Sequence, residues 1–182
     1  MRRRTLDLLM SWLGVLLTVG LLVAGSLLTW GYQFANSSVH SQLAAQSIFF
    51  PPKGSPALAS PKIGPYLNPY AGKQLLTGRE AEVWADHFIA VHLMEIGGGK
   101  TYAQVSAMSM ADPTNTQLSG EVQTLFRGET LRGLLLNAYA FWTFGQIAMW
   151  SAIGAFVAAI LMLILTVLGF AHYRRDDPRD VI

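Results

Sequence analysis

The amino-acid sequence predicts a mainly α-helical membrane protein with two transmembrane helices and a small helical extracytoplasmic domain that carries a proline-rich arm. Two observations support this prediction: two long stretches lack charged residues, and a cluster of arginines stands beside each stretch near an end of the chain. The composition points the same way. Only 13% of the 182 residues are charged and 52% are hydrophobic, whereas a soluble domain is about a quarter charged.

The first apolar stretch covers residues 8–30 and follows a short basic segment, residues 1–7. About 20 apolar residues suffice for a helix to cross a hydrocarbon core of about 30 Å. A cleaved signal peptide is the alternative, because arginines precede the stretch. The apolar part is longer than the roughly 7–15 residues usual in signal peptides, and no clean A-x-A cleavage site follows it. We therefore expect a retained membrane anchor.

The second apolar stretch, residues 147–171, ends a longer segment without formal charge, residues 133–172. We expect a helix over residues 112–146 that runs into this second span as one continuous helix. Small residues recur on the span at four-residue spacing, which lets helix backbones approach closely inside a membrane. The candidates for helix packing, against the first span or against a partner, are Ser151, Gly154, Ala155, Ala158 and Ala159.

The orientation follows from the basic residues next to the spans. No Lys or Arg occurs between Arg4 and Lys53, so the outer flank of the first span is bare. Cytoplasmic flanks carry an excess of Lys and Arg. We therefore expect both termini in the cytoplasm, residues 31–146 outside the cytoplasm, and residues 172–182 as a cytoplasmic tail. The flanking basic residues are Arg2, Arg3, Arg4, Arg174, Arg175 and Arg179.

The extracytoplasmic domain begins with a helical extension of the first span, residues 33–50, which we expect to turn into an extended strand. Residues 51–73 follow and hold six of the eight prolines. Proline fixes φ, removes a hydrogen-bond donor and disfavours helix in the residue before it. We expect an extended, polyproline-like arm, which Tyr66 and Tyr70 could attach to a neighbour.

A helix is predicted over residues 78–96. Thr77 and Glu80 fit a capping box, and the glycines at 97–99 end the pattern. The helix is apolar on two nearly opposite sides, so we expect it to be sandwiched, within this domain or between this protein and another. The candidate partner contacts are Trp84, Phe88, Val91, Tyr66 and Tyr70.

A short helix is then expected over residues 102–110. The next helix is expected to begin with Asp112 as its N-cap and Pro113 at its first position. An apolar stripe continues that helix towards the second span.

No motif in the chain predicts catalysis, a cofactor or a metal site. The chain has no cysteine, which excludes disulfides, zinc–thiolate sites and thiol nucleophiles. Residues 97–101 read GGGKT, but the phosphate-binding motif needs a glycine at the position of Met94. His87 and His92 are five residues apart, so they point in different directions on a helix. No basic patch predicts a nucleic-acid partner.

Five stretches of the sequence are distinctive: SQLAAQSIFFPPKGSPAL, YAGKQL, GGGKTYAQVSA, ADPTNTQL and FRGETLRGLLLNAYAFWTFG. In these stretches, and over nearly its whole length, the chain resembles a family of uncharacterised two-span membrane proteins of actinobacteria. Some members are labelled as aromatic ring-opening dioxygenases, but non-haem iron needs clustered His and carboxylate ligands, and this chain has four scattered histidines. The resemblance implies an actinobacterial plasma membrane and no site residues.

We therefore expect a non-catalytic accessory subunit or assembly factor, in contact with membrane lipids, that binds a larger membrane protein complex. Respiratory complexes of actinobacteria carry small accessory subunits of this general shape, so a respiratory complex is one candidate host. An enzyme or metal-dependent catalyst built on the extracytoplasmic domain is a second hypothesis. A homo-oligomeric envelope sensor is a third, although the predicted cytoplasmic ends are short.

Reporter fusions test the predicted orientation. A reporter that works only outside the cytoplasm should be active when it is fused at residue 60 and silent at residue 182. A reporter that works only inside the cytoplasm should show the opposite pattern, because the positive-inside rule places the two positions on different sides. Exchange of the two patterns would contradict the orientation.

Overall fold

The computed structural model describes residues 3–175, and their side chains from residue 5 onward. The predicted segment 1–7 and the predicted tail 172–182 therefore lie partly outside the described residues. Within the described chain the protein is mainly α-helical, without a β-strand, and two of its helices are long and apolar enough to cross a membrane. The predicted fold class is confirmed to this extent.

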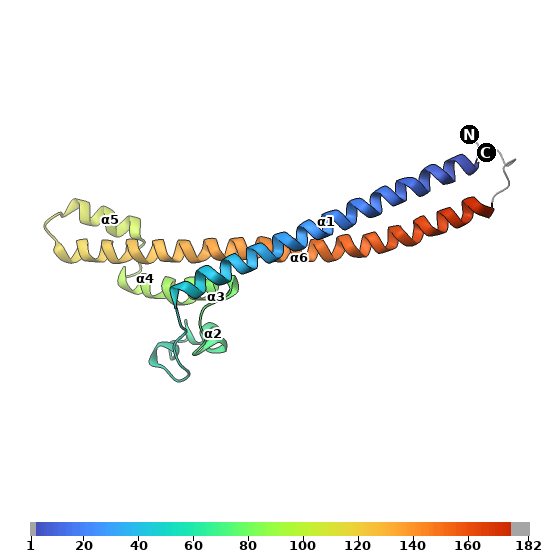
Figure 1. Ribbon diagram of the computed structural model, residues 1–182. Helices are drawn as coiled ribbons and strands as arrows, with labels where there is room; N and C mark the ends of the chain where they lie inside the picture. The colour runs from blue at the N-terminus through green and yellow to red at the C-terminus, as the bar shows by residue number, and fades with distance from the viewer. Residues whose placement is uncertain (1–2, 176–182) are drawn as a thin grey trace. The chain divides into compact units, whose positions relative to one another are not determined.

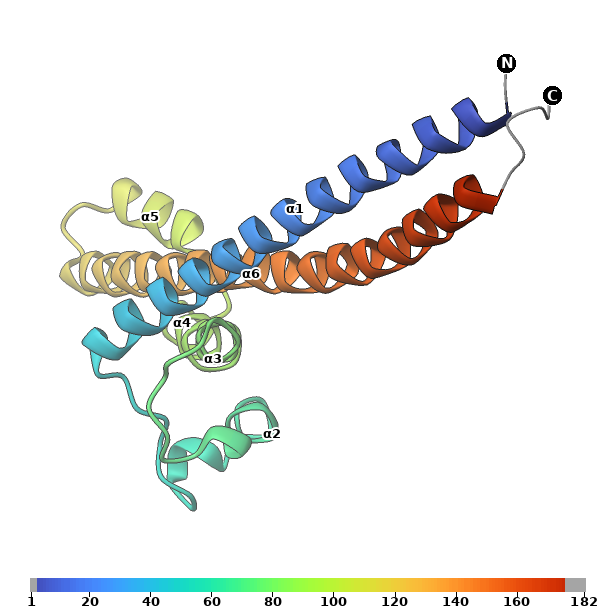
Figure 2. The same ribbon diagram turned by 45° about the vertical axis from the view of Figure 1, so that its right-hand side comes forward.

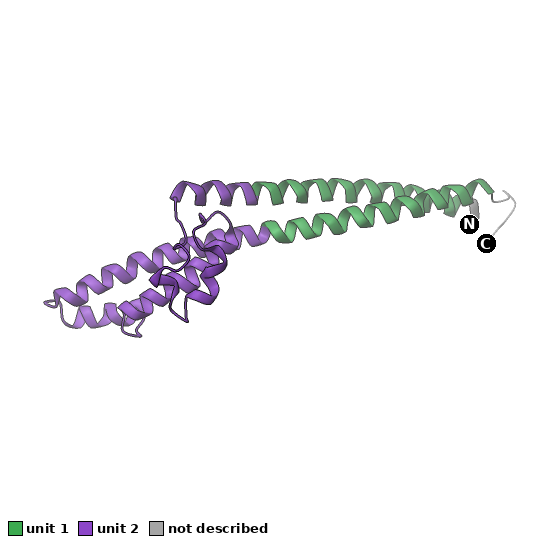
Figure 3. Cartoon of the chain, turned by 90° about the horizontal axis from the view of Figure 1, so that it is seen from below, with its two compact units in different colours: residues 1–34, 145–182 green, residues 35–144 purple. Residues whose placement is uncertain are grey.

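The chain divides into two compact units, which Figure 3 shows in different colours. Unit 1 comprises residues 1–34 and 145–182, and unit 2 comprises residues 35–144. Two long helices contribute to both units: α1, Arg3–Gln46, and α6, Thr116–Arg175.

Unit 1 consists of the first part of α1 and the last part of α6, which lie side by side and antiparallel (Figure 1). Trp12 near the start of α1 packs edge-to-face on Phe170 near the end of α6, with ring centroids 6.0 Å apart. Further along, Gly25 of α1 lies against the ring of Phe156. Apolar side chains cover the outside of this pair, as expected of helices that face lipid.

Unit 2 holds the remaining elements, and most of them are short helices or helical turns (Figure 2). One π-helical turn, η3, lies between α3 and α4 and continues them as one helical segment. The elements between α1 and α6 are η1 Pro56–Leu58, α2 Gly64–Leu67, η2 Asn68–Tyr70, α3 Gly78–Trp84, η3 Ala85–Ile89, α4 Ala90–Ile96 and α5 Tyr102–Ala111.

The helix α1 begins before the predicted span and includes most of the predicted helical extension. It continues to Gln46, and Ser47 with φ 52° follows it. The predicted strand before residue 50 is wrong: the extended backbone is limited to one antiparallel bridge, between Phe49 and Gln74. Helix persists here because Val39 and Leu43, one turn apart on the same face, are buried in the core of unit 2.

The proline-rich segment 51–73 is not the extended arm that its composition predicts. It folds into η1, α2 and η2, and each of these elements has a proline in its first two positions, where the missing N–H costs nothing. The segment also has its own apolar residues, Leu58, Ile63 and Leu67, all of which are buried in the core. The free energy gained by burying these side chains offsets the conformational entropy that the segment loses when it folds.

The helical segment from α3 to α4 has the limits that its capping signals indicate. Thr77 and Glu80 form the capping box. At the other end Gly98 and Gly99 adopt φ of 57° and 83°, which glycine tolerates without strain. The segment is sandwiched within unit 2, because one side faces the proline-rich segment and the other faces α6.

The start of α6 differs from the prediction. Asp112 ends α5, and its backbone N–H bonds to the Met108 carbonyl. The N-cap of α6 is instead Asn115, whose side-chain oxygen accepts a hydrogen bond from Leu118 N at 3.1 Å. The helix then begins at Thr116 and runs to Arg175 without a break, so the expected continuity into the second apolar stretch is present.

Substitution at Gly78 should destabilise unit 2. An added Cβ at Gly78 would collide with the Cβ and indole of Trp142, and overpacking of a tight contact costs roughly 1–3 kcal/mol. Gly78→Ala should therefore lower the melting temperature of the full chain in detergent, followed by far-UV circular dichroism.

Gly120→Ala is the matched control, because Gly120 lies in α6 with no atom within 4 Å of an added Cβ. That change should be neutral or stabilise by up to about 1 kcal/mol, because alanine favours helix. Equal effects of the two substitutions would show that Gly78 is not a packing contact.

Candidate functional site

Three of the five predicted partner-contact residues, Tyr70, Trp84 and Phe88, pack together with Phe50 in unit 2. The Trp84 ring packs edge-to-face on Phe50, at 5.2 Å between centroids, and stacks on Phe88 at 4.3 Å. On the other side of Phe50, the Tyr70 ring stacks at 5.2 Å. We call Phe50, Tyr70, Trp84 and Phe88 the aromatic cluster. Each such ring pair contributes roughly 0.5–1.5 kcal/mol beyond its buried area.

The cluster attaches the proline-rich segment to the α3–α4 segment. Tyr66 stacks flat on His87, with ring centroids 3.5 Å apart and an interplanar angle of 2°. Val91, the fifth predicted contact, is half-buried on the wall of an open cavity of about 430 Å³ that Lys62 and Glu95 also line. The predicted contacts pack within the chain but are not fully covered by it: Tyr66 is 47% exposed, and Tyr70, Trp84, Phe88 and Val91 are half-buried.

The two histidines of the α3–α4 segment that we considered as ligands have neighbours within the chain. His92 Nδ1 lies 2.7 Å from the carbonyl oxygen of Phe88, one turn earlier in the helix. His87 is held by the Tyr66 ring. Among residues 3–175, no three His, Asp or Glu side chains gather as metal ligands would.

An ion pair joins the π-turn to α6. Arg132 Nη2 donates to Asp86 Oδ1 at 2.8 Å, and Arg132 Nη1 lies 3.5 Å from Glu129 Oε2. The hydrogen bond to Asp86 raises the pKa of Arg132 above its ordinary value, in spite of partial burial. The pair is about one-third exposed, so its contribution to stability is roughly 0–1 kcal/mol. Its main effect is to orient η3.

The helix pair of unit 1 packs through a small-residue seam, which we define as Ser11, Gly14, Thr18 and Gly25 of α1 with Ala152, Ala159, Thr166 and Gly169 of α6. Within each helix, members recur at intervals of three, four or seven residues. This spacing is typical of antiparallel helices with a left-handed crossing. Ser11, Thr18 and Thr166 are buried, and each hydroxyl donates to the carbonyl four residues earlier in its own helix.

The predicted helix-packing residues only partly coincide with this seam. Ala159 is buried, Ala155 and Ala158 are half-buried, and Ser151 and Gly154 are exposed. No atom lies within 4 Å of an added Cβ at Gly154. The four-residue spacing missed Ala152 and Thr166, which the seven-residue spacing around Ala159 identifies.

A second feature missed in the sequence is an apolar stripe on α6 within unit 2. We define the apolar stripe as Leu131, Leu134, Phe141 and Phe144. Their exposed fractions are 42%, 63%, 41% and 69%. The opposite face of the same helix contributes Leu125 and Leu135 to the core of unit 2. The apolar character all round this part of α6 could have signalled the stripe, because a water-facing helix normally has one polar face.

No protein-family model, no curated protein and no solved structure matches this chain. The resemblance to two-span actinobacterial proteins therefore stays a prediction.

The packing of the seam can be tested by cross-linking, because the chain has no cysteine of its own. The Cβ of Ser11 lies 3.7 Å from the position of a Cβ on Gly169, close to the roughly 3.8 Å found in disulfides. Ser11→Cys with Gly169→Cys should therefore form an intramolecular disulfide under mild oxidation, detected by peptide mass spectrometry.

The control pair is Ser11→Cys with Leu168→Cys, because Leu168 is 59% exposed. This pair should remain reduced under the same conditions in dilute micelles. A disulfide in the control pair that forms as fast as the first would contradict the seam.

Proposed function

We propose that this chain is a non-catalytic membrane accessory subunit or assembly factor that binds a larger membrane protein complex. Both termini lie in the cytoplasm and residues 31–146 form an extracytoplasmic domain. The two long apolar helices of unit 1 support the membrane insertion, and the arginines at the two ends of the chain support the orientation.

The observation that carries the proposal is the apolar stripe. Leu131, Leu134 and Phe141 precede Ile147, the start of the predicted second span, by 16, 13 and 6 residues. The proposed topology therefore places these three residues outside the hydrocarbon and Phe144, three residues before Ile147, beside the headgroups. Exposed apolar area costs about 25 cal/mol per Å² relative to a buried state. A contiguous exposed patch of this kind marks an interaction surface.

The stripe fits a helix of a partner better than a small ligand. It runs along one helix, and its large side chains stand at the three- and seven-residue spacing through which two helices interdigitate. Asn137 lies within the same exposed face and supplies a polar group that can fix the register of a partner helix. The partner is therefore expected to present its own apolar helix beside α6.

The polar groups of unit 2 support a structural rather than a catalytic role. The side chains of η3 that could carry chemistry are used in packing. Asp86 pairs with Arg132, and His87 stacks on Tyr66. These contacts hold the α3–α4 segment between the proline-rich segment and α6. The arrangement supports a domain that presents α6 to a partner. The resemblance suggests a host in an actinobacterial plasma membrane, and a respiratory complex is the candidate class.

Purification of a tagged copy from native membranes tests the proposal. In mild detergent, the wild-type chain should copurify with other membrane proteins in a fixed ratio, measured by quantitative mass spectrometry. Leu134→Glu should reduce that recovery by about tenfold or more, because a carboxylate in a desolvated helix contact loses its hydration.

Met110→Glu is the matched control, because Met110 is an apolar residue that is 72% exposed but lies on α5, outside the stripe. It should leave the recovery unchanged. A second tag on a coexpressed copy distinguishes a homo-oligomer. A wild-type chain that is recovered alone, as a monomer or only with itself, would contradict the proposal.

A further inference from the structure

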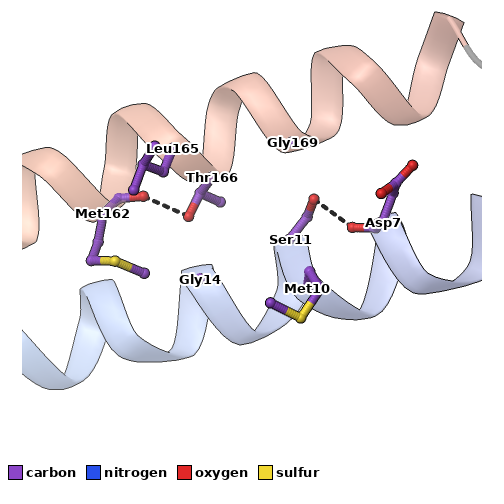
Figure 4. Close-up of a pocket in the computed structure, with 8 residues that line it drawn as sticks. All are labelled: Asp7, Met10, Ser11, Gly14, Met162, Leu165, Thr166 and Gly169. Carbon is purple, nitrogen blue, oxygen red and sulfur yellow. Dashed lines mark hydrogen bonds between the residues drawn. The ribbon is translucent and has the colours of Figure 1, made fainter.

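A cavity of about 250 Å³ lies between α1 and α6 in unit 1 (Figure 4). The cavity is at the end of the helix pair where α1 begins, and the two helices contribute equally to its wall. Its lining combines apolar side chains with an acid, two hydroxyls and two glycines. These residues are Asp7, Met10, Ser11, Gly14, Met162, Leu165, Thr166 and Gly169.

The polar side chains of this cavity can accept hydrogen bonds but have no proton left to donate into it. Ser11 Oγ–H donates to the Asp7 carbonyl at 2.7 Å, and Thr166 Oγ1–H donates to the Met162 carbonyl at 2.7 Å (Figure 4). Each hydroxyl oxygen keeps its lone pairs for another partner. An ionised Asp7 side chain is likewise an acceptor only.

The Asp7 carboxylate points from α1 towards α6 (Figure 4). Its Oδ2 atom is buried and has no hydrogen-bond partner among the described residues. Burial of a carboxylate oxygen without a donor is unfavourable, and a buried charge is normally paired. The cavity therefore combines unused acceptors, a negative charge and free space.

Two glycines of the facing helices make room for these hydroxyls, which belong to residues that are 3% (Ser11) and 5% (Thr166) exposed. A Cβ on Gly169 would lie 2.7 Å from Ser11 Oγ, and a Cβ on Gly14 would collide with Thr166 Oγ1. Any larger residue at either position would cover a hydroxyl that now faces the cavity. The apolar part of the wall, from Met10, Met162 and Leu165, suits the carbon atoms next to a charged group.

We propose that this cavity binds the primary ammonium group of an aminophospholipid headgroup. An ammonium carries the positive charge and the three N–H donors that the lining lacks, with Asp7 as counter-ion and Ser11 and Thr166 as acceptors. A cavity of this size holds several water-sized groups of about 30 Å³ each. The proposal rests on the membrane insertion proposed above, and it is independent of any protein partner.

The test compares two lipids that differ in donors but not in net charge. The full chain is reconstituted in nanodiscs with equal amounts of phosphatidylethanolamine and phosphatidylcholine that have the same acyl chains. It is then extracted in mild detergent, and the retained lipids are counted by native mass spectrometry. Wild type should retain phosphatidylethanolamine about tenfold over phosphatidylcholine, because a charge-assisted hydrogen bond gives about that ratio.

Asp7→Asn should abolish the preference, and Glu121→Gln, at a half-buried carboxylate of unit 2, should leave it unchanged. Displacement of the lipid by free ethylammonium at low concentration would identify a soluble amine as the source of the same group. Equal retention of the two lipids by wild type, or an unchanged preference in Asp7→Asn, would overturn the proposal.

The outcome is separable from the proposed function. A chain that fails to enter nanodiscs would refute the membrane insertion, and with it this site. A chain that enters nanodiscs without a headgroup preference would refute the site alone.

Discussion

The close approach of the α3–α4 segment to α6 is the contact on which unit 2 depends. Gly78 lies against Trp142, and Gly128 lies against Leu93, so a glycine meets a large side chain at each end of the contact. A side chain on either glycine would separate the two helical segments. With this side fixed, the other side of the segment is free to receive Phe50, Tyr66 and Tyr70 from the proline-rich segment.

The π-turn η3 makes this double contact possible. One turn with an extra residue places Asp86 towards Arg132 of α6 and His87 towards Tyr66 of the proline-rich segment. A π-turn has poorer backbone geometry than an α-helix and persists where its surroundings favour it. Here the favourable surroundings are the ion pair on one side and the stacked rings on the other.

Local signals predicted the helices well, and distant contacts account for what they missed. The capping box at Thr77 and the length of the two apolar stretches depend on neighbouring residues alone. The folded proline-rich segment was missed because its order comes from burial of Leu67 in a core built by other elements. The ion pair between Arg132 and Asp86 could not be predicted from local sequence either, because the two residues are 46 positions apart. The π-turn leaves no local signal that we can identify.

In the candidate sites too, local sequence predicted the residue types, and distant contacts decided where they lie. Aromatic residues were recognised as contact residues from their type, but the sequence does not say whether a ring packs inside the chain or against another protein. The structure brings the aromatic cluster together internally and leaves the apolar stripe exposed. On the second apolar stretch, the four-residue rule selected exposed Gly154, whereas the seam follows the seven-residue spacing of Ala152, Ala159 and Thr166.

The core of unit 2 has a consequence for biosynthesis. Its buried residues include Val39 and Leu43 from α1, Leu67 from the proline-rich segment, and Leu125 and Leu135 from α6. The ribosome makes Leu135 96 residues after Val39. Everything between α1 and α6 is therefore synthesised before this core can close. Folding of unit 2 is thus timed by the synthesis of α6, and until then its apolar residues stay uncovered and prone to aggregation.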